Sequence, residues 1–349
     1  MLITDKNRKY YLIGIVTFSV LFTSFSYYFY QAFYTPNVLV EEESPAYIKI
    51  PKGATFRQVS DSLFHNGIVN DMVSFSLVAK LMDYQENVKA GRYEVRPRMT
   101  NMQLVRALRS GQQAPLNITF NNIRTKEDLA GRITRNLEVD SASFYSLLTD
   151  TVHIGKFGFN AETIMGMFIP NTYEVYWNTT APELFDRMHK EYERFWDDNR
   201  KAKAAALGMD PQEVSVLASI VQAETVKADE RPKVAGVYLN RLRINMPLQA
   251  DPTLVFALGD FSIKRVLNVH KEIDSPYNTY KNLGLPPGPI NLPEISALDA
   301  VLNYQDHDYL YFCAKDDFSG YHAFATNLRD HLINARRYSA ALNAAGIYR

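Results

Sequence analysis

This sequence of 349 residues has almost no cysteine, and its formal net charge at pH 7 is zero. Cys313 is the single cysteine, which excludes an intrachain disulfide and a cysteine-rich zinc site. The 38 lysines and arginines balance 38 aspartates and glutamates. A nucleic-acid-binding surface needs a basic surplus, so this balance gives no support to a nucleic acid as partner.

Several catalytic motifs are missing as well. The seven histidines show no paired metal-ligand spacing such as HExxH, and neither a G-x-S-x-G elbow nor a Walker loop occurs. We therefore expect no catalytic metal and no cofactor. The chemistry must come from other residues, and carboxylates are the first candidates.

Charged residues are also missing from Leu12–Tyr34, "LIGIVTFSVLFTSFSYYFYQAFY". About 20 apolar residues span a bilayer core, so this stretch is long enough for a transmembrane helix. Basic residues precede it and glutamates 41–43 follow it, which predicts that residues 1–11 are cytoplasmic and the rest extracytoplasmic. A cleaved signal peptide is the alternative, but its apolar region is usually shorter and ends in small residues rather than bulky aromatics. We therefore favour an uncleaved anchor.

The remaining sequence divides into a linker and two domains. Residues 35–46 are predicted to be a short polar linker. Residues 47–120 are predicted to form a small α+β unit, with strands at "YIKIP" and "GRYEV" and helices capped by Thr55, Asp71 and Thr100. Residues 121–349 are mainly helical, with a strand at "YLYFCAK" and a last helix from about Asn327 to Asn343. The predicted class is α+β.

One predicted helix carries an unexpected acid. The helix starts at a capping box of Asp210 and Glu213, and Leu217, Ile220 and Val221 place an apolar face along it. Glu224 is the next position on that face, although burial disfavours an ionised carboxylate. Either Glu224 forms a buried salt bridge with Arg231 or Arg241, or it lies in a cleft where a protonated acid is useful.

Two further segments have the composition of a sugar-binding groove. In "MPLQADPTLVFALGD", Gln249, Asp251 and Thr253 alternate, which predicts that they point the same way from an extended segment. Asp251 is a candidate second catalytic carboxylate, although a turn before proline explains it equally well. "SPYNTYKNLGLPPGPI" places Tyr277, Asn278, Thr279 and Tyr280 before a stiff loop, which is either a binding loop or simply a turn.

These segments together resemble the YceG-like (MltG) endolytic murein transglycosylases. The matching stretches are "LASIVQAET", "ERPKVAGVYLNRLRINMPLQADPTLVFALG", "YNTYKNLGLPPGPI", "YLYFCAK" and "YHAFATNLRDH", and the resemblance covers the chain end to end. It implies a LysM-like subdomain over residues 47–120 and a catalytic domain with a lysozyme-like glycan cleft over residues 121–349. It implies that Glu224, followed by Thr225, is the lone catalytic acid/base. It also implies that the cleft is lined by Asn240, Gln249, Asp251, Thr253, Tyr277, Asn278, Thr279 and Tyr280.

The sequence departs from the family pattern at three positions. Gln222 stands where the family often has a glutamate. Met165 and Asn171, in "MGMFIPNTY", replace the Glu and Asp of the family's "EGxxFPDTY". Neither of these last two positions is therefore expected to supply an essential acid. This strengthens the expectation that Glu224 is the sole carboxylate of the reaction.

The resemblance implies a membrane-anchored enzyme that cleaves the bond between N-acetylmuramic acid and N-acetylglucosamine in nascent peptidoglycan. The products would have 1,6-anhydro ends, and elongation would stop beside the peptidoglycan synthases at the bacterial cytoplasmic membrane. Two alternatives stay open. One is a hydrolytic muramidase with Asp251 as its second carboxylate. The other is a non-catalytic, membrane-anchored scaffold that binds peptidoglycan, and the LysM-like unit either binds glycan or sets the height of the catalytic domain.

Overall fold

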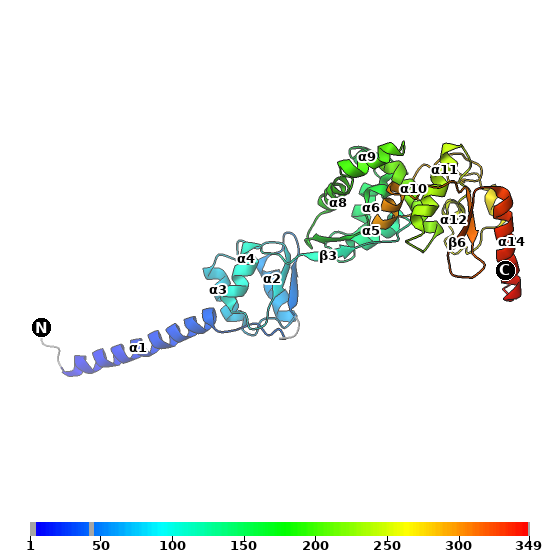
Figure 1. Cartoon of the computed structure of the whole chain (residues 1–349). Coiled ribbons are helices and arrows are strands. Elements are labelled where there is room, and N and C mark those ends of the chain that lie inside the picture. Colours follow the sequence, from blue (N-terminus) through cyan, green and yellow to red (C-terminus); the bar gives the residue numbers. More distant parts are fainter. Residues whose placement is uncertain (1–4, 42–44, 348–349) are drawn as a thin grey trace. The chain divides into compact units, whose positions relative to one another are not determined.

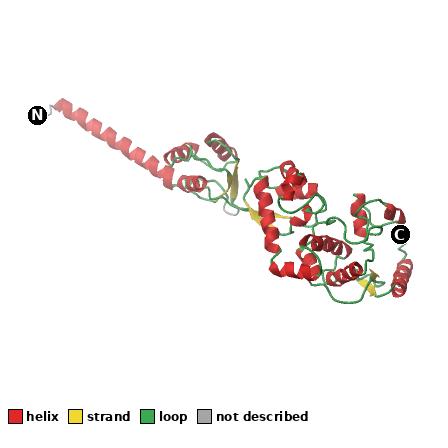
Figure 2. Ribbon diagram, turned by 90° about the horizontal axis from the view of Figure 1, so that it is seen from above, coloured by secondary structure: helices red, strands yellow, loops and turns green. Residues whose placement is uncertain are grey.

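The computed structural model describes residues 5–41 and 45–347, and helices make up most of it (Figures 1 and 2). The strands form two-stranded sheets, so the predicted α+β class is confirmed. The chain divides into two compact units. Unit 1 comprises residues up to Asn117 with 136–138 and 174–179, and unit 2 comprises 118–135, 139–173 and 180–349.

Unit 1 alternates helices with a short antiparallel sheet, in which β1 pairs with β2 so that Ile48 lies opposite Tyr93. Thr55 and Thr100 form capping boxes with Gln58 and Gln103, as their positions before apolar helices predict. The elements are α1 (Asp5–Tyr34), β1 (Ala46–Ile50), α2 (Phe56–His65), α3 (Met72–Leu81), β2 (Gly91–Val95) and α4 (Asn101–Ser110). β3 (Leu116–Thr119) follows and pairs with β4.

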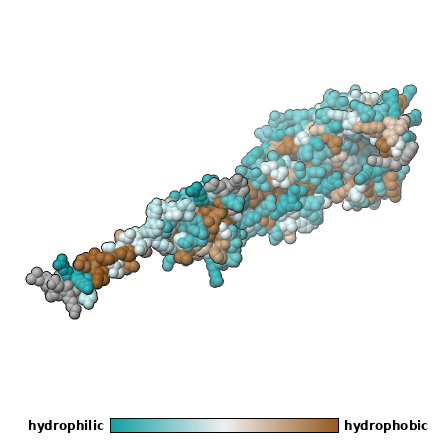
Figure 3. Space-filling view, turned by 90° about the horizontal axis from the view of Figure 1, so that it is seen from below, coloured by the Kyte–Doolittle hydropathy of each residue, from teal (hydrophilic) through white to brown (hydrophobic). Residues whose placement is uncertain are grey.

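Helix α1 has the length and composition of a membrane-crossing helix. The segment Arg8–Tyr34 has 27 residues and a mean hydropathy of 1.6, and the protein buries none of its apolar window. Figure 3 shows hydrophobic residues along much of this helix. An N-terminal apolar helix is therefore present where the sequence predicts one.

The first part of the predicted linker, residues 35–46, packs into unit 1, and residues 42–44 of this segment lie outside the described residues. Asn37 and Val38 are buried, and Val38 forms an isolated bridge with Val69. Asn37 Nδ2 donates to Asn101 Oδ1 at 2.7 Å. Asn101 Nδ2 in turn donates to Ala32 O at 2.9 Å and to Ser74 Oγ at 3.0 Å. The last carbonyls of a helix lack intrahelical partners, so Asn101 satisfies one of them at the end of α1.

Unit 2 is a helical assembly around one buried helix, α10. Val214, Leu217, Ala218, Ile220 and Val221 of α10 are buried in its main hydrophobic core. The helices of this unit are α5 (Lys126–Thr134), α6 (Ser141–Thr149), α7 (Thr151–Gly155), η1 (Ile164–Met167), α8 (Ala181–Phe195), α9 (Asp198–Ala206), α10 (Pro211–Glu224), α11 (Arg231–Arg243), α12 (Asp251–Leu258), η2 (Asn268–Glu272), α13 (Ile295–Leu302) and α14 (Leu328–Ala344). β4 (Thr172–Val175) lies before α8, and β5 (Tyr311–Ala314) pairs with β6 (His322–Ala325) in an antiparallel hairpin.

The start of α10 is determined by its local sequence. The Asp210 side chain accepts hydrogen bonds from the Gln212 and Glu213 backbone nitrogens. The Glu213 side chain in turn accepts a hydrogen bond from the Asp210 nitrogen. Pro211 occupies the first turn, where its missing N–H costs nothing. Helices α11 and α13 pack on α10, so the helix is enclosed until its last turn. That last turn carries Glu224.

We predict that Asn101→Ala destabilises unit 1 by about 2–3 kcal/mol, because the substitution leaves Asn37 Nδ2, Ser74 Oγ and the Ala32 carbonyl with fewer partners in a buried site. Hydrogen–deuterium exchange of the full chain in detergent micelles would measure this loss as faster exchange in α3 and α4. Asn66→Ala is the matched control, because Asn66 makes its bond to the Ser62 carbonyl at an exposed position. Equal exchange in the two variants would contradict the prediction.

Candidate active site

Glu224 is the last residue of α10 and lines a cavity of about 420 Å³ within unit 2. Asp251, at the start of α12, lines the same cavity. The two carboxylates therefore face a common space, although 27 positions separate them in the sequence. Asn291 and a set of apolar and cationic residues complete the wall: Arg124, Ala223, Pro252, Val255, Phe256, Phe261, Ile263, Lys264, Arg265, Val266 and Ile290.

The protonation of Glu224 is set by its surroundings. Burial raises the pKa of its carboxyl group from an ordinary value of 4.5 to about 7, and the nearby charge of Asp251 acts in the same direction. A hydrogen bond from Tyr238 and the charge of Arg241 oppose this rise. The C-terminal end of a helix also carries partial negative charge, which disfavours a second negative charge there. Glu224 is therefore protonated in a large fraction of molecules near neutral pH.

The partner of Glu224 is a tyrosine and not an arginine. Tyr238 OH, on α11, donates to Glu224 Oε1 at 2.7 Å. Burial raises the pKa of Tyr238 well above its ordinary value of 10, so the phenol keeps its proton. The residue itself is 1 % exposed, so this hydrogen bond is shielded from bulk water.

The salt bridge considered from the sequence is not found. Arg231 Nη1 pairs with Glu294 Oε2 at 3.1 Å. Arg241 donates from Nε to Leu310 O and from Nη1 to Leu248 O, at 2.7 and 2.6 Å. Both arginines therefore have other partners, and the interpretation of Glu224 as half of a structural ion pair is wrong. Arg241 instead ties α11 to the segment before α12 and to β5.

Asp251 has a different environment from Glu224. Tyr280 OH donates to Asp251 Oδ1 at 2.5 Å, and Asp251 is exposed as a residue. It also lies in the first turn of α12, where the positive end of the helix favours a carboxylate. The cavity thus combines a carboxyl group at the C-terminal end of one helix with a carboxylate at the N-terminal end of another.

The prediction of an extended segment through Gln249, Asp251 and Thr253 is wrong. Residues 251–258 form helix α12, since Pro252 fits the first turn of a helix as well as it fits a strand. Thr253 is completely buried, and its Oγ1 lies 2.9 Å from Thr279 Oγ1. Gln249 is exposed, with a left-handed φ of 51°. The three side chains therefore do not point the same way.

Several other expected cleft residues do not line the cavity that holds Glu224. Asn278 is fully buried and donates to the carbonyls of Lys271 and Ile273. Thr279 Oγ1 accepts from the Ala250 nitrogen at 3.0 Å, which holds the start of α12. Tyr277 packs its ring on Phe256, with centroids 4.8 Å apart. Asn240 donates to the carbonyls of His307 and Tyr309, and so supports the approach to β5.

The proline-rich loop, residues 284–294, is attached to α10 by polar groups of Ser219 and Gln222. Ser219 Oγ accepts from the Ile290 nitrogen at 3.0 Å, and the Ser219 carbonyl accepts from Asn291 Nδ2 at 2.8 Å. Gln222 Nε2 donates to Leu292 O, and its Oε1 accepts from the Glu294 nitrogen at 2.6 Å. An amide both donates and accepts, which a glutamate at this position could not do while ionised. Gln222 therefore serves here as a two-way link to the loop.

The other two departures lie away from the cavity. Met165 is buried in η1. Asn171 is exposed, and its Oδ1 accepts from the Thr172 nitrogen. Neither residue lines the cavity that holds Glu224.

Tyr238 and the Glu230–His322 pair were not expected from the sequence. Glu230 is buried, and its Oε2 lies 2.6 Å from His322 Nδ1. The same carboxylate accepts from Thr225 Oγ1 at 3.4 Å, which links β6 to the residue after Glu224. A buried tyrosine hydroxyl needs a hydrogen-bond partner, so the position of Tyr238 in "VAGVYLNRL" could have predicted a buried polar contact. The identity of that partner depends on helix packing.

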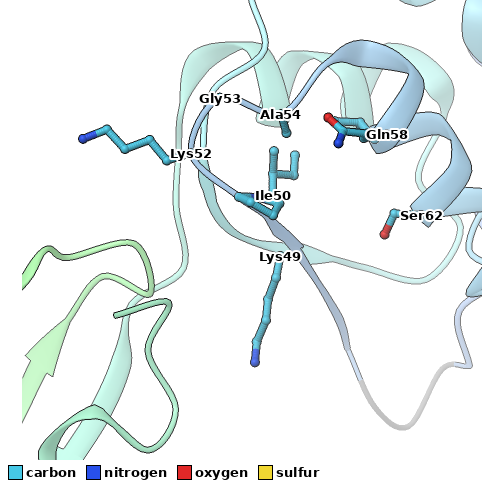
Figure 4. A pocket seen from close by; sticks show the side chains of 9 residues that line it. Lys49, Ile50, Lys52, Gly53, Ala54, Gln58 and Ser62 are labelled. Carbon is cyan, nitrogen blue, oxygen red and sulfur yellow. The ribbon is translucent and has the colours of Figure 1, made fainter. Parts of the chain in front are cut away.

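A second cavity, of about 330 Å³, lies in unit 1 at the turn between β1 and α2 (Figure 4). Ile50, Ala54, Gln58 and Ser62 surround it, whereas the Lys49 and Lys52 side chains extend away from it. Among the residues that the structure describes, no carboxylate lines this cavity. The site with Glu224, which does hold an acid, is therefore the candidate active site.

Comparisons with known proteins identify the family of this chain. The sequence model of the YceG-like family matches residues 48–337. A Streptococcus pneumoniae protein named endolytic murein transglycosylase is 28% identical over 96% of this chain, which spans 66% of that protein's length. A Bacillus subtilis protein of the same name is 29% identical over 85% of each chain.

A solved structure is similar as well. The crystal structure of a YceG-like protein from Listeria monocytogenes aligns with a TM-score of 0.56 and 27% identity, over 83% of this chain and 99% of that one. The family match covers most of the chain, and its range includes Glu224, Tyr238 and the cavity-lining residues Ile290 and Asn291. The chain belongs to the YceG-like family.

Proposed function

We propose that this protein is an endolytic lytic transglycosylase that cleaves the bond between N-acetylmuramic acid and N-acetylglucosamine in peptidoglycan. The observation that carries the proposal is the Glu224 carboxyl group, whose pKa burial raises to about 7 and which lines a cavity at the end of a buried helix. The endolytic murein transglycosylases of Streptococcus pneumoniae and Bacillus subtilis, to which this chain is similar, support the choice of substrate.

In the proposed mechanism Glu224 acts twice. The protonated carboxyl group first donates its proton to the glycosidic oxygen, and the bond to the muramoyl C1 breaks. The carboxylate then removes a proton from the C6 hydroxyl of the same muramoyl residue, and that oxygen bonds to C1 to close a 1,6-anhydro ring. One group with a pKa near neutrality suits both steps, and the hydroxyl of the substrate replaces an activated water.

Neighbouring groups have supporting roles. The Tyr238 hydroxyl holds the Glu224 carboxyl group in one orientation and stabilises its ionised form in the second step. Asp251 would place negative charge near the oxocarbenium-like transition state, and Tyr280 fixes its orientation. Thr253, Asn278 and Thr279 are buried, so we assign them to support of the wall and not to contact with sugar.

A hydrolytic muramidase is the second candidate, because Asp251 lines the same cavity as Glu224. In an inverting glycosidase the second carboxylate activates a water, and in a retaining one it attacks the sugar. Either route would release a reducing end in place of an anhydro ring. A non-catalytic scaffold has less support, since Glu224 is not part of an ion pair among the described residues.

We also propose a location and an arrangement. The apolar helix α1 would anchor the protein in the bacterial cytoplasmic membrane, with its N-terminus inside and both units outside. Unit 1 would be a LysM-like module, and unit 2 would hold a lysozyme-like cleft. A tethered enzyme can reach only glycan near the membrane, so nascent strands are the proposed substrate and peptidoglycan synthases the proposed neighbours.

The direct test is mass spectrometry of the products from uncrosslinked peptidoglycan strands. We expect the full-length protein to produce anhydro-muramoyl ends and Glu224→Gln to lower the rate about 10²–10⁴-fold, the usual contribution of a general acid/base. Glutamine keeps the size of the side chain and an acceptor for Tyr238. Reducing ends would favour the muramidase, and equal cleavage by the variant would remove Glu224 from the mechanism.

The pH dependence of cleavage reports on the same group. Because Glu224 must be protonated in the free enzyme, kcat/KM should fall as pH rises through about 7. Tyr238→Phe removes a hydrogen bond that lowers the pKa of Glu224. The alkaline limb of the variant's kcat/KM profile should therefore move to higher pH. Rates across the pH range for both proteins would measure this. A limb that stays in place, or moves to lower pH, would contradict the assigned contact.

Stability should show the same ionisation with a defined sign. The folded pKa of Glu224, about 7, lies above its unfolded value of 4.5, so its contribution to stability is complete below about 4.5 and is lost as pH rises through 7. The glutamine of the Glu224→Gln variant cannot ionise, so the variant does not lose this stability. As pH rises from about 4.5 to 7, its free energy of unfolding should therefore increase relative to that of wild type, by at most about 3 kcal/mol. Thermal unfolding at pH 5 and pH 8 measures this gain. Asp198→Asn, at an exposed acid on α9 outside the cavity, is the control, and an equal gain there would refute the special burial of Glu224.

A further inference from the structure

The cavity beside Glu224 has a second chemical character that the proposed reaction does not use. Three cationic residues, Arg124, Lys264 and Arg265, line it together with the two acids. The charges that act on the Glu224 carboxyl group are those of Asp251 and Arg241. Arg124 and Lys264 share the cavity with Glu224, whose hydrogen-bond partner is Tyr238 and not either cation.

Among the described residues, Arg124 and Lys264 line the wall without an ion pair to neutralise them. Arg124 lies over the ring of Phe261, 4.8 Å from the ring centre, and not against an acid. Neither Arg124 nor Lys264 has an ion-pair partner in the part of the chain that the structure describes. The acid of the same loop, Asp260, is occupied by the Ser262 hydroxyl and backbone nitrogen at 2.6 and 3.0 Å and does not line the cavity.

The position of Arg124 is fixed by its neighbours. Ile123 is buried, and its carbonyl accepts from the Leu292 nitrogen at 2.8 Å. Thr125 caps helix α5 by accepting from the Asp128 nitrogen. Arg124 is therefore presented between a buried residue and a helix cap, on the same side as Ile290 and Asn291 of the proline-rich loop.

From this arrangement we infer that Arg124 and Lys264 form a subsite for the carboxylates of the peptide stem on the muramoyl residue. This inference rests on the proposed function. The peptide leaves the muramoyl ring at the C3 lactyl ether, close to the C1 at which the bond breaks, so it must pass along the wall beside Glu224. Peptide stems carry free carboxylates, and guanidinium and ammonium groups pair with them. The diphosphate of a lipid carrier is another anion, but it occurs once per strand and not at each muramoyl residue.

The inferred specificity is for strands with charged peptide stems over strands whose stems are neutral. The size of the effect is set by the exposure of the cations, because a solvent-exposed ion pair changes an equilibrium only modestly. We expect a preference of about 2- to 5-fold for each cation, which weakens as ionic strength rises. It should appear in KM more than in kcat, since the subsite lies apart from the reacting bond.

The test measures binding and cleavage on two matched strands of equal length. One has free stem carboxylates, and in the other these groups are carboxamides. Full-length Glu224→Gln in detergent micelles serves for affinity and full-length wild type for kcat/KM. We expect both ratios to favour the free carboxylates and to fall toward one in Arg124→Gln and Lys264→Gln. Lys201→Gln, an exposed cation on α9 outside the cavity, is the control and should keep the ratio.

Each result has a separate meaning. Equal affinity for the two strands would overturn the inference, whether or not wild type cleaves them. A retained preference without cleavage would overturn the proposed function alone. A third strand without its lipid diphosphate identifies the alternative anion: if removing the diphosphate abolishes the preference while the carboxylates remain, the subsite does not bind the peptide stem. Because each ratio compares two substrates on one protein, a partly unfolded variant does not imitate the expected loss.

Discussion

The burial of one carboxyl group at the end of an apolar helix is the constraint on which unit 2 depends. An ionised Glu224 in this position loses hydration without gaining an ion pair, so its pKa rises to about 7. Tyr238 limits that rise, because its hydroxyl stabilises the ionised form. A buried acid without any partner would destabilise the fold, and one in a salt bridge would remain ionised and could not donate a proton. The hydrogen bond from Tyr238 gives Glu224 a pKa between those of these two cases.

The polar residues around the cavity divide into those that face it and those that hold its wall. Ser219 and Gln222 fasten the proline-rich loop to α10, and Thr279 fastens the start of α12. Gly288 belongs to the same construction, because a Cβ there would lie 2.1 Å from the Glu162 carbonyl oxygen. These contacts all use backbone groups, so they fix the path of the chain and not only the side chains. Asp251 and Glu224 are thereby set on separate elements with a fixed relation.

The sequence allowed some of this to be predicted, and the physical reason for the rest is clear. Caps such as Thr55, Thr100 and Asp210 depend on neighbours three residues away, so local sequence determines them. Glu224 stood out because it interrupts an apolar helical face. The segment at Asp251 was misjudged because alternation over five residues is short, and Pro252 is compatible with a strand edge and with a first helical turn. The partner of Glu224 depended on how α11 packs against α10, and no local pattern distinguishes Tyr238 from Arg241.

The same distinction between local sequence and tertiary packing applies to unit 1, at residues 36–38, which follow α1. The polar composition of residues 35–46 predicted a linker there. Instead Asn101 satisfies the Ala32 carbonyl at the end of α1 and binds Asn37 of the next segment, so helix and unit share one buried polar network. Side chains of this kind tolerate little displacement, since each lost bond leaves a buried polar group unpaired. The C-terminal end of α1 is therefore fixed to unit 1 by buried polar side chains and not only by the chain itself.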